Sequence, residues 1–413
     1  MIESTVHDRR AIEALRAGVP NGDAVRALGS HQTEIITEFE GKLANAAEVE
    51  AYGPTGFVIT GSFGSGKSHL VEELHQLALS RNYVSSKISI SKETPLHLPQ
   101  RVVQAAVGAM QAKDKPDGVL LDMVMTHKSE KSTAQAFYRW CGSPESGVSV
   151  MFRSLLDLRD VGIESLEAVD LLVRYFSAET IPITTIRRQL TEVGLRSPVE
   201  VVPASERPWQ TMRFLSRFCQ VSGYRGWVIF LDEAELISKY GPISRARAYD
   251  QLGRWLGLRP GHRVAGTAVV ATVINDFVWE VLGQKGDRWS VPELLGRGRR
   301  PADMDGVPYA VEAMEAIDAA LPLAPMTLAH LQKSHAVLRE AHSRAYAWDA
   351  PELDVEYRRQ DPMRHYVRRW INEWDLRRLY GRDTKLKFGA ETIDVSYAED
   401  DEFDGPEWSE AVD

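Results

Sequence analysis

Cysteine is nearly absent from this sequence, and the two cysteines that occur stand alone. Cys141 and Cys219 are the only ones in 413 residues, and neither has a second thiol at CxxC spacing. A zinc site or a disulfide framework needs such pairs or clusters. The sequence therefore indicates neither, and we expect both cysteines to be small core residues or surface thiols.

Long apolar runs are missing as well. No stretch approaches the roughly 18 consecutive apolar residues of a membrane helix. The first residues of the chain include Asp8, Arg9 and Arg10 and contain no apolar centre typical of a secretory signal. We therefore expect a cytoplasmic protein without a membrane partner.

The chain also has no excess of basic residues. Its net charge is −9, and the eight acidic residues of 399–413, a segment without any basic residue, account for nearly all of it. The overall charge therefore does not exclude a basic face that binds nucleic acid. We expect the acidic tail, 391–413, to be disordered, as an interaction tail or a mimic of nucleic-acid charge.

The clearest motif that is present is GSFGSGKS at 61–68, between the apolar FVIT and the helical HLVEEL. Strand, glycine-rich turn and helix are the context of a P-loop, whose backbone N–H groups and helix end converge on phosphate oxygens. Lys67 is expected to reach the β- and γ-phosphates, and the Ser68 hydroxyl to ligate Mg²⁺. The predicted ATP-binding residues are Gly61, Ser62, Phe63, Gly64, Ser65, Gly66, Lys67, Ser68 and His69.

A second motif, WVIFLDEAELI at 227–237, reads as a buried parallel strand that ends in two carboxylates. This is the form of a Walker B motif. Asp232 is expected to hold Mg²⁺, and Glu233 to orient and deprotonate the attacking water. An isolated run of this kind is weak evidence, but it follows a complete P-loop in the same chain.

Two further candidates follow the Walker B motif. Thr272, at the end of the apolar strand 266–273, is expected to sense the γ-phosphate and is by strand position a better candidate than Asn275 and Asp276 just beyond it. A β-branched residue such as Thr272 also merely suits a strand. We expect a helix at 277–282 and then a turn and another strand at 283–294. Arg288 is the candidate arginine finger for a neighbouring subunit, with a solvated or phosphate-binding loop around Arg297, Arg299 and Arg300 as the alternative.

Helical patterns fill most of the remaining chain. Residues 1–50 read as helices that either lie against the nucleotide base or form a packing pair. A helical insertion at about 111–205 interrupts the core, 51–300, and its 183–193 helix either packs on its neighbours or presents Arg187 and Arg188 to DNA. Residues 301–390 read as a helical lid. Its arginines, interleaved with Tyr357, Tyr366, Trp370 and Trp374, either track nucleic acid, contact ATP, or are solvated while the aromatics face the core.

Four phrases of the chain carry a resemblance to a known family. They are RRAIEALRAGVPNGDAVRALG at 9–29, GSFGSGKSHL at 61–70, VIFLDEAELI at 228–237 and WDLRRLYG at 374–381. With them the chain resembles an AAA+ module of the origin-recognition type. It resembles more closely the AAA+ ATP-binding proteins of the BREX phage-defence family, which are related to the ATPase of the Shango defence system.

The resemblance implies an α/β P-loop NTPase of AAA+ type with a parallel sheet and a C-terminal helical lid. It also implies an accessory antiviral ATPase that cooperates with other defence proteins, such as a helicase, on DNA. From the residues we expect a Mg²⁺-dependent ATPase that acts as a homo-oligomer. The alternatives are a slowly hydrolysing nucleotide switch or scaffold, and a sequence-specific DNA-binding regulator.

Overall fold

The computed structural model describes residues 2–48, 54–127, 132–162, 165–196, 200, 202–259, 263–298, 300–354, 358, 361–381 and 397–400. Its centre is a five-stranded, all-parallel sheet with the strand order β2-β3-β4-β1-β5. The strands are β1 (Gly56–Thr60), β2 (Val84–Ser89), β3 (Trp227–Asp232), β4 (Thr267–Val273) and β5 (Leu321–Pro322). The predicted α/β class and parallel sheet are confirmed.

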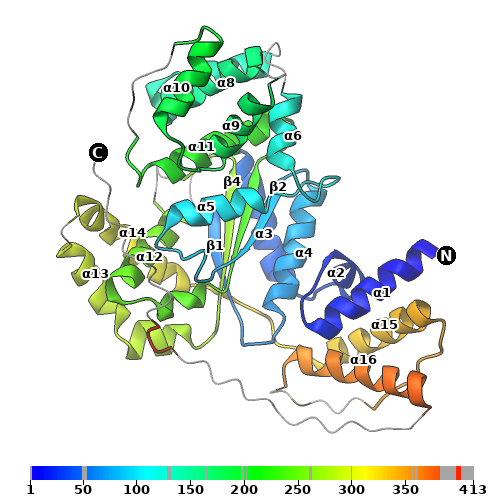
Figure 1. Ribbon diagram of the computed structural model, residues 1–413. Helices are drawn as coiled ribbons and strands as arrows, with labels where there is room; N and C mark the ends of the chain where they lie inside the picture. The colour runs from blue at the N-terminus through cyan, green and yellow to red at the C-terminus, as the bar shows by residue number, and fades with distance from the viewer. Residues whose placement is uncertain are drawn as a thin grey trace.

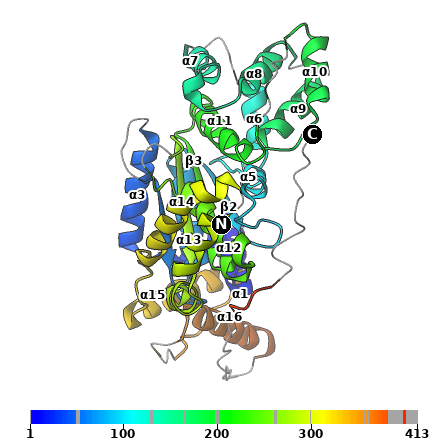
Figure 2. The same ribbon diagram turned by 90° about the vertical axis from the view of Figure 1, so that its left-hand side faces the viewer.

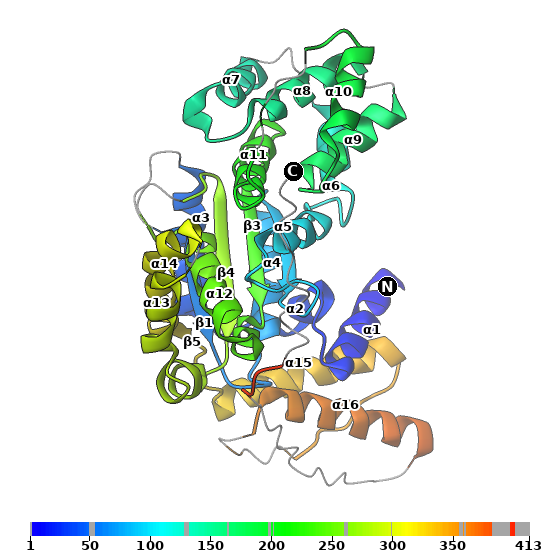
Figure 3. The ribbon, with the colours of Figure 1, turned by 60° about the vertical axis from the view of Figure 1, so that its left-hand side comes forward.

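Helices cover both faces of the sheet, because alternate strand residues are apolar on both sides (Figures 1 and 3). Phe57 and Phe230 pack with one set of helices, whereas Val58 and Ile229 pack with the other. The first set is α3 (Thr33–Ala47) and α4 (Lys67–Ser80). The second set is α5 (Pro99–Gly108), α11 (Arg207–Val221), α12 (Pro242–Trp255) and α14 (Pro301–Asp318).

The predicted insertion is helical and gathers at one end of the molecule (Figures 1 and 2). It contains α6 (Val119–Thr126), α7 (Ser132–Cys141), the short 3₁₀ turn η1 (Pro144–Ser146), α8 (Val150–Gly162), α9 (Leu166–Phe176) and α10 (Ile183–Glu192). Phe137, Phe152 and Phe176 of the insertion pack on Phe214 of α11, which joins the insertion to the main core. Cys141 and Cys219 are free and buried in this core.

The first and last long helices of the described chain pack together (Figure 1). These are α1 (Ile2–Ala17), α2 (Gly22–Leu28), α15 (Leu328–Tyr346) and α16 (Met363–Tyr380). Ile12 and Leu15 share a buried cluster with Tyr366, Trp370 and Trp374. Three aromatic residues of α16 therefore face a core, as one of the alternatives predicted, whereas Tyr380 at the end of the helix is exposed.

One predicted element is wrong. Residues 283–294 do not form a strand, because the end of the π-helix η3 (Val278–Gln284) leads into α13 (Asp287–Gly296). Gly286 takes the left-handed conformation that precedes α13, and Asp287 begins the helix fully buried against Arg245 and Tyr249. These long-range contacts outweigh the local pattern. The fifth strand of the sheet is β5 instead.

Three further points concern the predicted organisation. The helix α14 packs on α12 and α13, beside the core, and not with α15 and α16. Residues 397–400 of the predicted acidic tail contact the core, whereas 401–413, Arg299, Tyr357 and Arg359 lie outside the described residues. Within the described ranges, no helix combines the length and the apolarity that a membrane crossing requires.

Candidate nucleotide site

The P-loop lies at the carboxyl end of β1 and runs into α4, which begins at Lys67. Gly64 and Gly66 have φ values of 72° and 110°, in the region that favours glycine. A Cβ atom on Gly61 would stand 2.8 Å from Ser65 Oγ and 3.1 Å from side-chain atoms of Leu323 and Lys67, so a side chain here would force these neighbours to move. Carboxyl ends of parallel strands are where ligands bind in α/β folds, and the loop is open to this edge.

Backbone carbonyl groups of the P-loop hold the Lys67 side chain over the loop. Its Nζ donates to the carbonyl oxygens of Gly61, at 2.6 Å, and Ser62, at 3.4 Å. Burial lowers the pKa of Lys67, while the carboxylates of Glu235, Asp232, Glu233 and Asp276 counteract this effect. The ammonium group therefore lies among several negative charges and can transfer its hydrogen bonds to an incoming anion.

Ser68 and Asp232 bring the two sequence motifs into direct contact. The Ser68 hydroxyl donates to Asp232 Oδ2 at 3.1 Å, and the Thr272 hydroxyl donates to the other carboxylate oxygen. The serine hydroxyl and the carboxylate are oxygen ligands of the kind that Mg²⁺ prefers. Across the described part of the chain, no group of three or more His, Cys, Asp or Glu residues could hold a metal ion.

Glu233 begins the turn after β3 in a left-handed conformation, with φ 62° and ψ 36°. Its backbone N–H donates to Asp232 Oδ1, at 3.1 Å, and to Thr272 Oγ1, at 3.2 Å. A non-glycine residue in this conformation is costly and common at functional sites. Glu233 is exposed as a residue, but partial desolvation of its carboxyl group and the charge of Asp232 raise the pKa of this carboxyl.

Glu235 is a third carboxylate in the same cavity. Burial raises its pKa to about 7, although the nearby Lys67 opposes the shift. Its Oε2 is buried and has no hydrogen-bond partner among the described residues. The DEAE sequence contains this residue, but the Walker B pattern predicts roles only for the first two carboxylates.

Thr272 at the end of β4 and Asn275 just beyond it differ in whether they reach the cavity. Thr272 is fully buried under Asp232 and does not line the cavity. Asn275 lines it, accepting a hydrogen bond from Thr60 Oγ1 and donating one to Ser62 Oγ, both at 3.0 Å. Asn275 is therefore the polar residue of this strand end that touches the P-loop.

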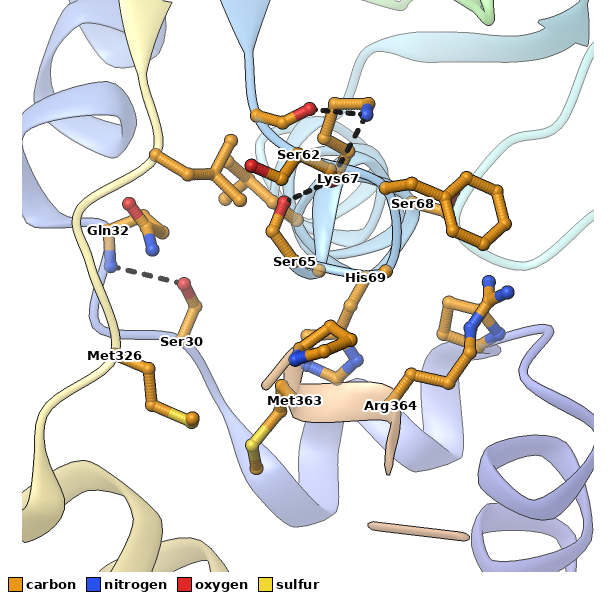
Figure 4. A pocket seen from close by; sticks show the side chains of 18 of the residues that line it. Ser30, Gln32, Ser62, Ser65, Lys67, Ser68, His69, Met326, Met363 and Arg364 are labelled. Atoms are coloured by element: carbon orange, nitrogen blue, oxygen red, sulfur yellow. Dashed lines mark hydrogen bonds between the residues drawn. The ribbon is translucent and has the colours of Figure 1, made fainter. Parts of the chain in front are cut away.

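The cavity at the P-loop has a volume of about 450 Å³ and extends to the packed terminal helices (Figure 4). In this view Met326 and Met363 lie below the P-loop residues. His31 and His330 stack with ring centroids 4.1 Å apart, and burial lowers the pKa of His31. The far end of the cavity thus combines apolar and aromatic side chains of α15, α16 and the segment before α3.

The side chain of Gln32 fastens this far end to the segment after β5. Its Oε1 accepts from the Ala324 N–H at 2.7 Å, and its Nε2 donates to the Ala324 carbonyl at 3.2 Å. His69, the last predicted ATP-binding residue, bonds the Gly29 carbonyl at 3.1 Å. The segment before α3 is therefore tied to both the P-loop helix and the chain beyond the sheet.

Arg364, at the start of α16, reaches the P-loop directly. Its guanidinium lies over the Phe63 ring, 5.1 Å from the centroid, and its backbone N–H donates to the Gly64 carbonyl. Burial, helped by the charge of Arg368, lowers the pKa of Arg364. Arg364 belongs to a set of arginines from which the sequence alone does not single it out, because no feature of the local sequence distinguishes it from its neighbours.

Arg288 lies on α13, outside the cavity, where its guanidinium pairs with Asp318 of α14 at 2.5 and 2.9 Å. Arg297, of the alternative cluster, directly follows α13 and pairs with Glu293 of that helix. Neither arginine approaches the P-loop of its own chain. A role for either at a nucleotide would require a second chain.

Comparison with known proteins agrees with this geometry. A family described as "BREX system ATP-binding protein BrxC/D" matches residues 4–136 and 172–281, more than half of the chain. The matched parts contain the P-loop, Asp232, Glu233 and Asn275. Searches of curated proteins and of solved structures found no match. The chain belongs to the family of BREX system ATP-binding proteins.

Proposed function

We propose that this protein is a Mg²⁺-dependent ATPase of AAA+ type that works with partner proteins of the BREX defence system on DNA. One observation carries the enzymatic part of the proposal. Lys67, Ser68, Asp232 and Glu233 line a single cavity, although the two motifs are separated by the whole helical insertion. Phosphate-binding, metal-binding and base groups thus meet where a triphosphate can lie.

The donor set fits a magnesium ion. Ser68 and Asp232 offer one hydroxyl and one carboxylate, and Mg²⁺ sites in phosphate-binding proteins are completed by substrate phosphates and water. When bound, the ion would neutralise charge on the phosphate oxygens. The Thr272 hydroxyl holds the Asp232 carboxylate in place for this role.

Glu233 is the proposed general base. It follows the metal carboxylate directly, it is exposed to the cavity, and its raised pKa makes it a better proton acceptor than an ordinary carboxylate. Lys67 neutralises the phosphates and leaves its backbone carbonyl partners when the triphosphate arrives. Asn275 replaces Thr272 as the better placed γ-phosphate sensor, because only Asn275 lines the cavity.

The AAA+ assignment and the lid are supported by topology. The P-loop strand β1 lies beside β4, which separates it from the Walker B strand β3, and α15 and α16 follow the sheet. Arg364 of α16 contacts the P-loop, so this helix pair can respond to bound ATP. We propose that α15 and α16 are the lid, and that α14 belongs to the core.

The proposal also includes assembly into a homo-oligomer and binding to DNA. Arg288 can serve as an arginine finger only for a neighbouring copy, so this role requires a homo-oligomer. Arg187 and Arg188 are exposed on α10, whose buried Ile186 and Leu190 face its packing partners, and offer one surface for DNA. Membership in a BREX family supports partners such as a helicase.

The decisive experiment compares Glu233→Gln and Lys67→Ala with the unchanged protein. We expect Glu233→Gln to lower ATP turnover about 10²- to 10⁴-fold while the Kd for ATP is kept. Lys67→Ala should abolish ATP binding itself. Unchanged turnover in Glu233→Gln would remove the general-base assignment.

A nucleotide-dependent switch or scaffold is the second candidate function. It is favoured by the ties between the P-loop and α16, which would let ATP occupancy order a partner surface without rapid hydrolysis. Turnover should be measured with and without DNA, beside mass photometry with ADP, ATP and ATP plus DNA. A monomer with negligible ATP turnover in every condition would support the nucleotide-dependent switch in place of the ATPase.

A further inference from the structure

A short segment, Tyr397–Asp400, lies against the ATPase core, and in Figure 1 its red ribbon lies at the lower left beside yellow-green ribbon of the core. The Tyr397 hydroxyl donates to Asp276 Oδ1 at 2.8 Å. Lys285 Nζ donates to the Tyr397 carbonyl at 3.0 Å, and the Asp400 N–H donates to the Lys239 carbonyl at 2.8 Å. The segment is therefore held through both its backbone and its side chains.

The core offers this segment a cationic site. Arg245 is 4% exposed and bonds Asp287 at 2.9 Å, the Tyr240 carbonyl at 2.8 Å and Glu399 at 2.8 Å. Lys285 lies 3.7 Å from the same Glu399 carboxylate. In these contacts the core supplies one carboxylate, that of Asp287, for the two cations. Glu399 of the docked segment supplies a second.

This electrostatic arrangement makes the site selective for an acidic ligand. A buried guanidinium without enough counter-charge is costly, so a carboxylate at this position stabilises the core. The hydrogen bond from Arg245 holds the pKa of Glu399 below its usual range. The aromatic ring of Tyr397, partly buried against the main core, provides an apolar anchor beside the charged contact.

The docked segment also contacts a residue that is adjacent in sequence to the lining of the nucleotide site. Asp276, its tyrosine partner, directly follows Asn275, which bonds Ser62 of the P-loop. Burial and Asp276 raise the pKa of Tyr397, and Glu235 of the cavity adds to the shift, so Tyr397 lies within electrostatic reach of that carboxylate. Docking therefore ties Asp276, which directly follows the cavity residue Asn275, to a segment that carries the acidic residues Glu399 and Asp400.

We propose that the surface formed by Lys239, Arg245, Asp276 and Lys285 is a binding site for a short acidic peptide with a tyrosine. The chain's own residues 397–400 are its resident ligand. We further propose that occupation of this peptide site opposes ATP binding, through Asp276 and Asn275 and through like charge. This second half rests on the proposed nucleotide site, whereas the first half does not.

The docking is tested without nucleotide, in the full chain, by hydrogen exchange at the Asp400 amide. We expect that amide to be protected in the unchanged protein and to exchange at least about tenfold faster in a Tyr397→Phe, Glu399→Gln double variant. Glu293→Gln, which removes a charge from α13 without touching the segment, should leave the exchange rate unchanged. Exchange of the Asp400 amide in the unchanged protein at the rate of an unstructured peptide would overturn the proposal.

Concentration separates the chain's own segment from that of a second copy. Protection within one chain is independent of protein concentration, so protection that is lost on dilution would overturn the assignment to the same chain.

The coupling is tested by ATP affinity in the same double variant. We expect the Kd for ATP to fall about fivefold, and saturating ATP to speed Asp400 exchange by a similar factor, because coupling is reciprocal. Equal ATP affinity in the double variant and the unchanged protein would remove the coupling but not the docking. Failure of the unchanged protein to bind ATP would instead contradict the proposed function, and Asp400 protection would still stand.

Discussion

Ser68 and Asp232 are 164 residues apart in the chain, yet the serine hydroxyl donates a 3.1 Å hydrogen bond to the carboxylate. This contact joins the helix after the P-loop to the end of β3. It places a hydroxyl and a carboxylate where both can face one divalent cation.

Replacing Ser68 by alanine removes one oxygen ligand while Asp232 keeps its contact with Thr272. We expect the Mg²⁺ concentration for half-maximal ATP binding to rise about tenfold, equivalent to roughly 1.4 kcal/mol, the size of one hydrogen bond to a charged group. ATP titrations at several Mg²⁺ concentrations measure the shift. Ser80→Ala, which removes a hydroxyl from the other end of α4, is the control. An identical Mg²⁺ dependence in both variants would remove Ser68 from the metal site.

Asn275 and Thr272 can be separated by their different burial. Asn275→Ala should lower ATP turnover about 10- to 100-fold with a nearly unchanged free energy of unfolding, since a polar group aimed at the phosphate is lost. Thr272→Val should lower the free energy of unfolding by about 1–3 kcal/mol, because the Glu233 amide loses a buried partner. Turnover assays and urea unfolding give both quantities. The reverse pattern would return the sensor role to Thr272.

Glu235 gives a pH-dependent prediction for the nucleotide-free protein. Its pKa is about 7 in the folded chain, compared with an ordinary value of 4.5. Between these values the folded state binds more protons than the unfolded state, so the free energy of unfolding falls as pH rises. Glu235→Gln should therefore be more stable than the unchanged protein by about 3 kcal/mol at pH 8, and by less than about 1 kcal/mol at pH 5.

Urea unfolding at pH 5 and pH 8 measures this difference, with Glu293→Gln on the exposed surface of α13 as the charge-matched control. If Glu235→Gln and Glu293→Gln show the same pH dependence, Glu235 titrates as an ordinary carboxylate.

The arginine-finger role of Arg288 can be tested by substitution, because its contact with Asp318 of the same chain lies outside the nucleotide cavity. At concentrations where the protein assembles, Arg288→Ala should lower turnover about 10³-fold or more without weakening ATP binding. Arg297→Ala, which removes another α13 arginine, should not. If turnover is kept and only stability changes slightly, the ion pair with Asp318 is the whole role of Arg288.

Local sequence was sufficient to predict the P-loop and the Walker B strand. The reason is that their residues act through adjacent backbone: Gly64, Gly66 and Lys67 form one turn, and β3 ends directly in Asp232. Most helices were predicted for the same reason. Their apolar periodicity is local, and the tertiary packing agrees with it.

The missed features depend on contacts between distant parts of the chain. The helix at α13 is fixed by the burial of Asp287 against Arg245 and Tyr249, which a local pattern cannot contain. The role of Arg364 depends on the packing of α16 against α1, more than 300 residues earlier in the sequence. The sensor role of Thr272 stays a prediction, because it rests on strand position alone, which does not reveal which polar group reaches the cavity.

The packing of α1 and α2 against α15 and α16 has a consequence for the newly synthesised chain. Chains emerge from the ribosome with the amino end first, and domains fold as their parts become available. Here the P-loop appears early, but Met326, His330, Met363 and Arg364 complete the cavity only after every strand of the described sheet has been synthesised. A nascent chain that has reached β5 therefore exposes the apolar faces of α1 and α2, and the complete nucleotide cavity forms only after α16 has left the ribosome.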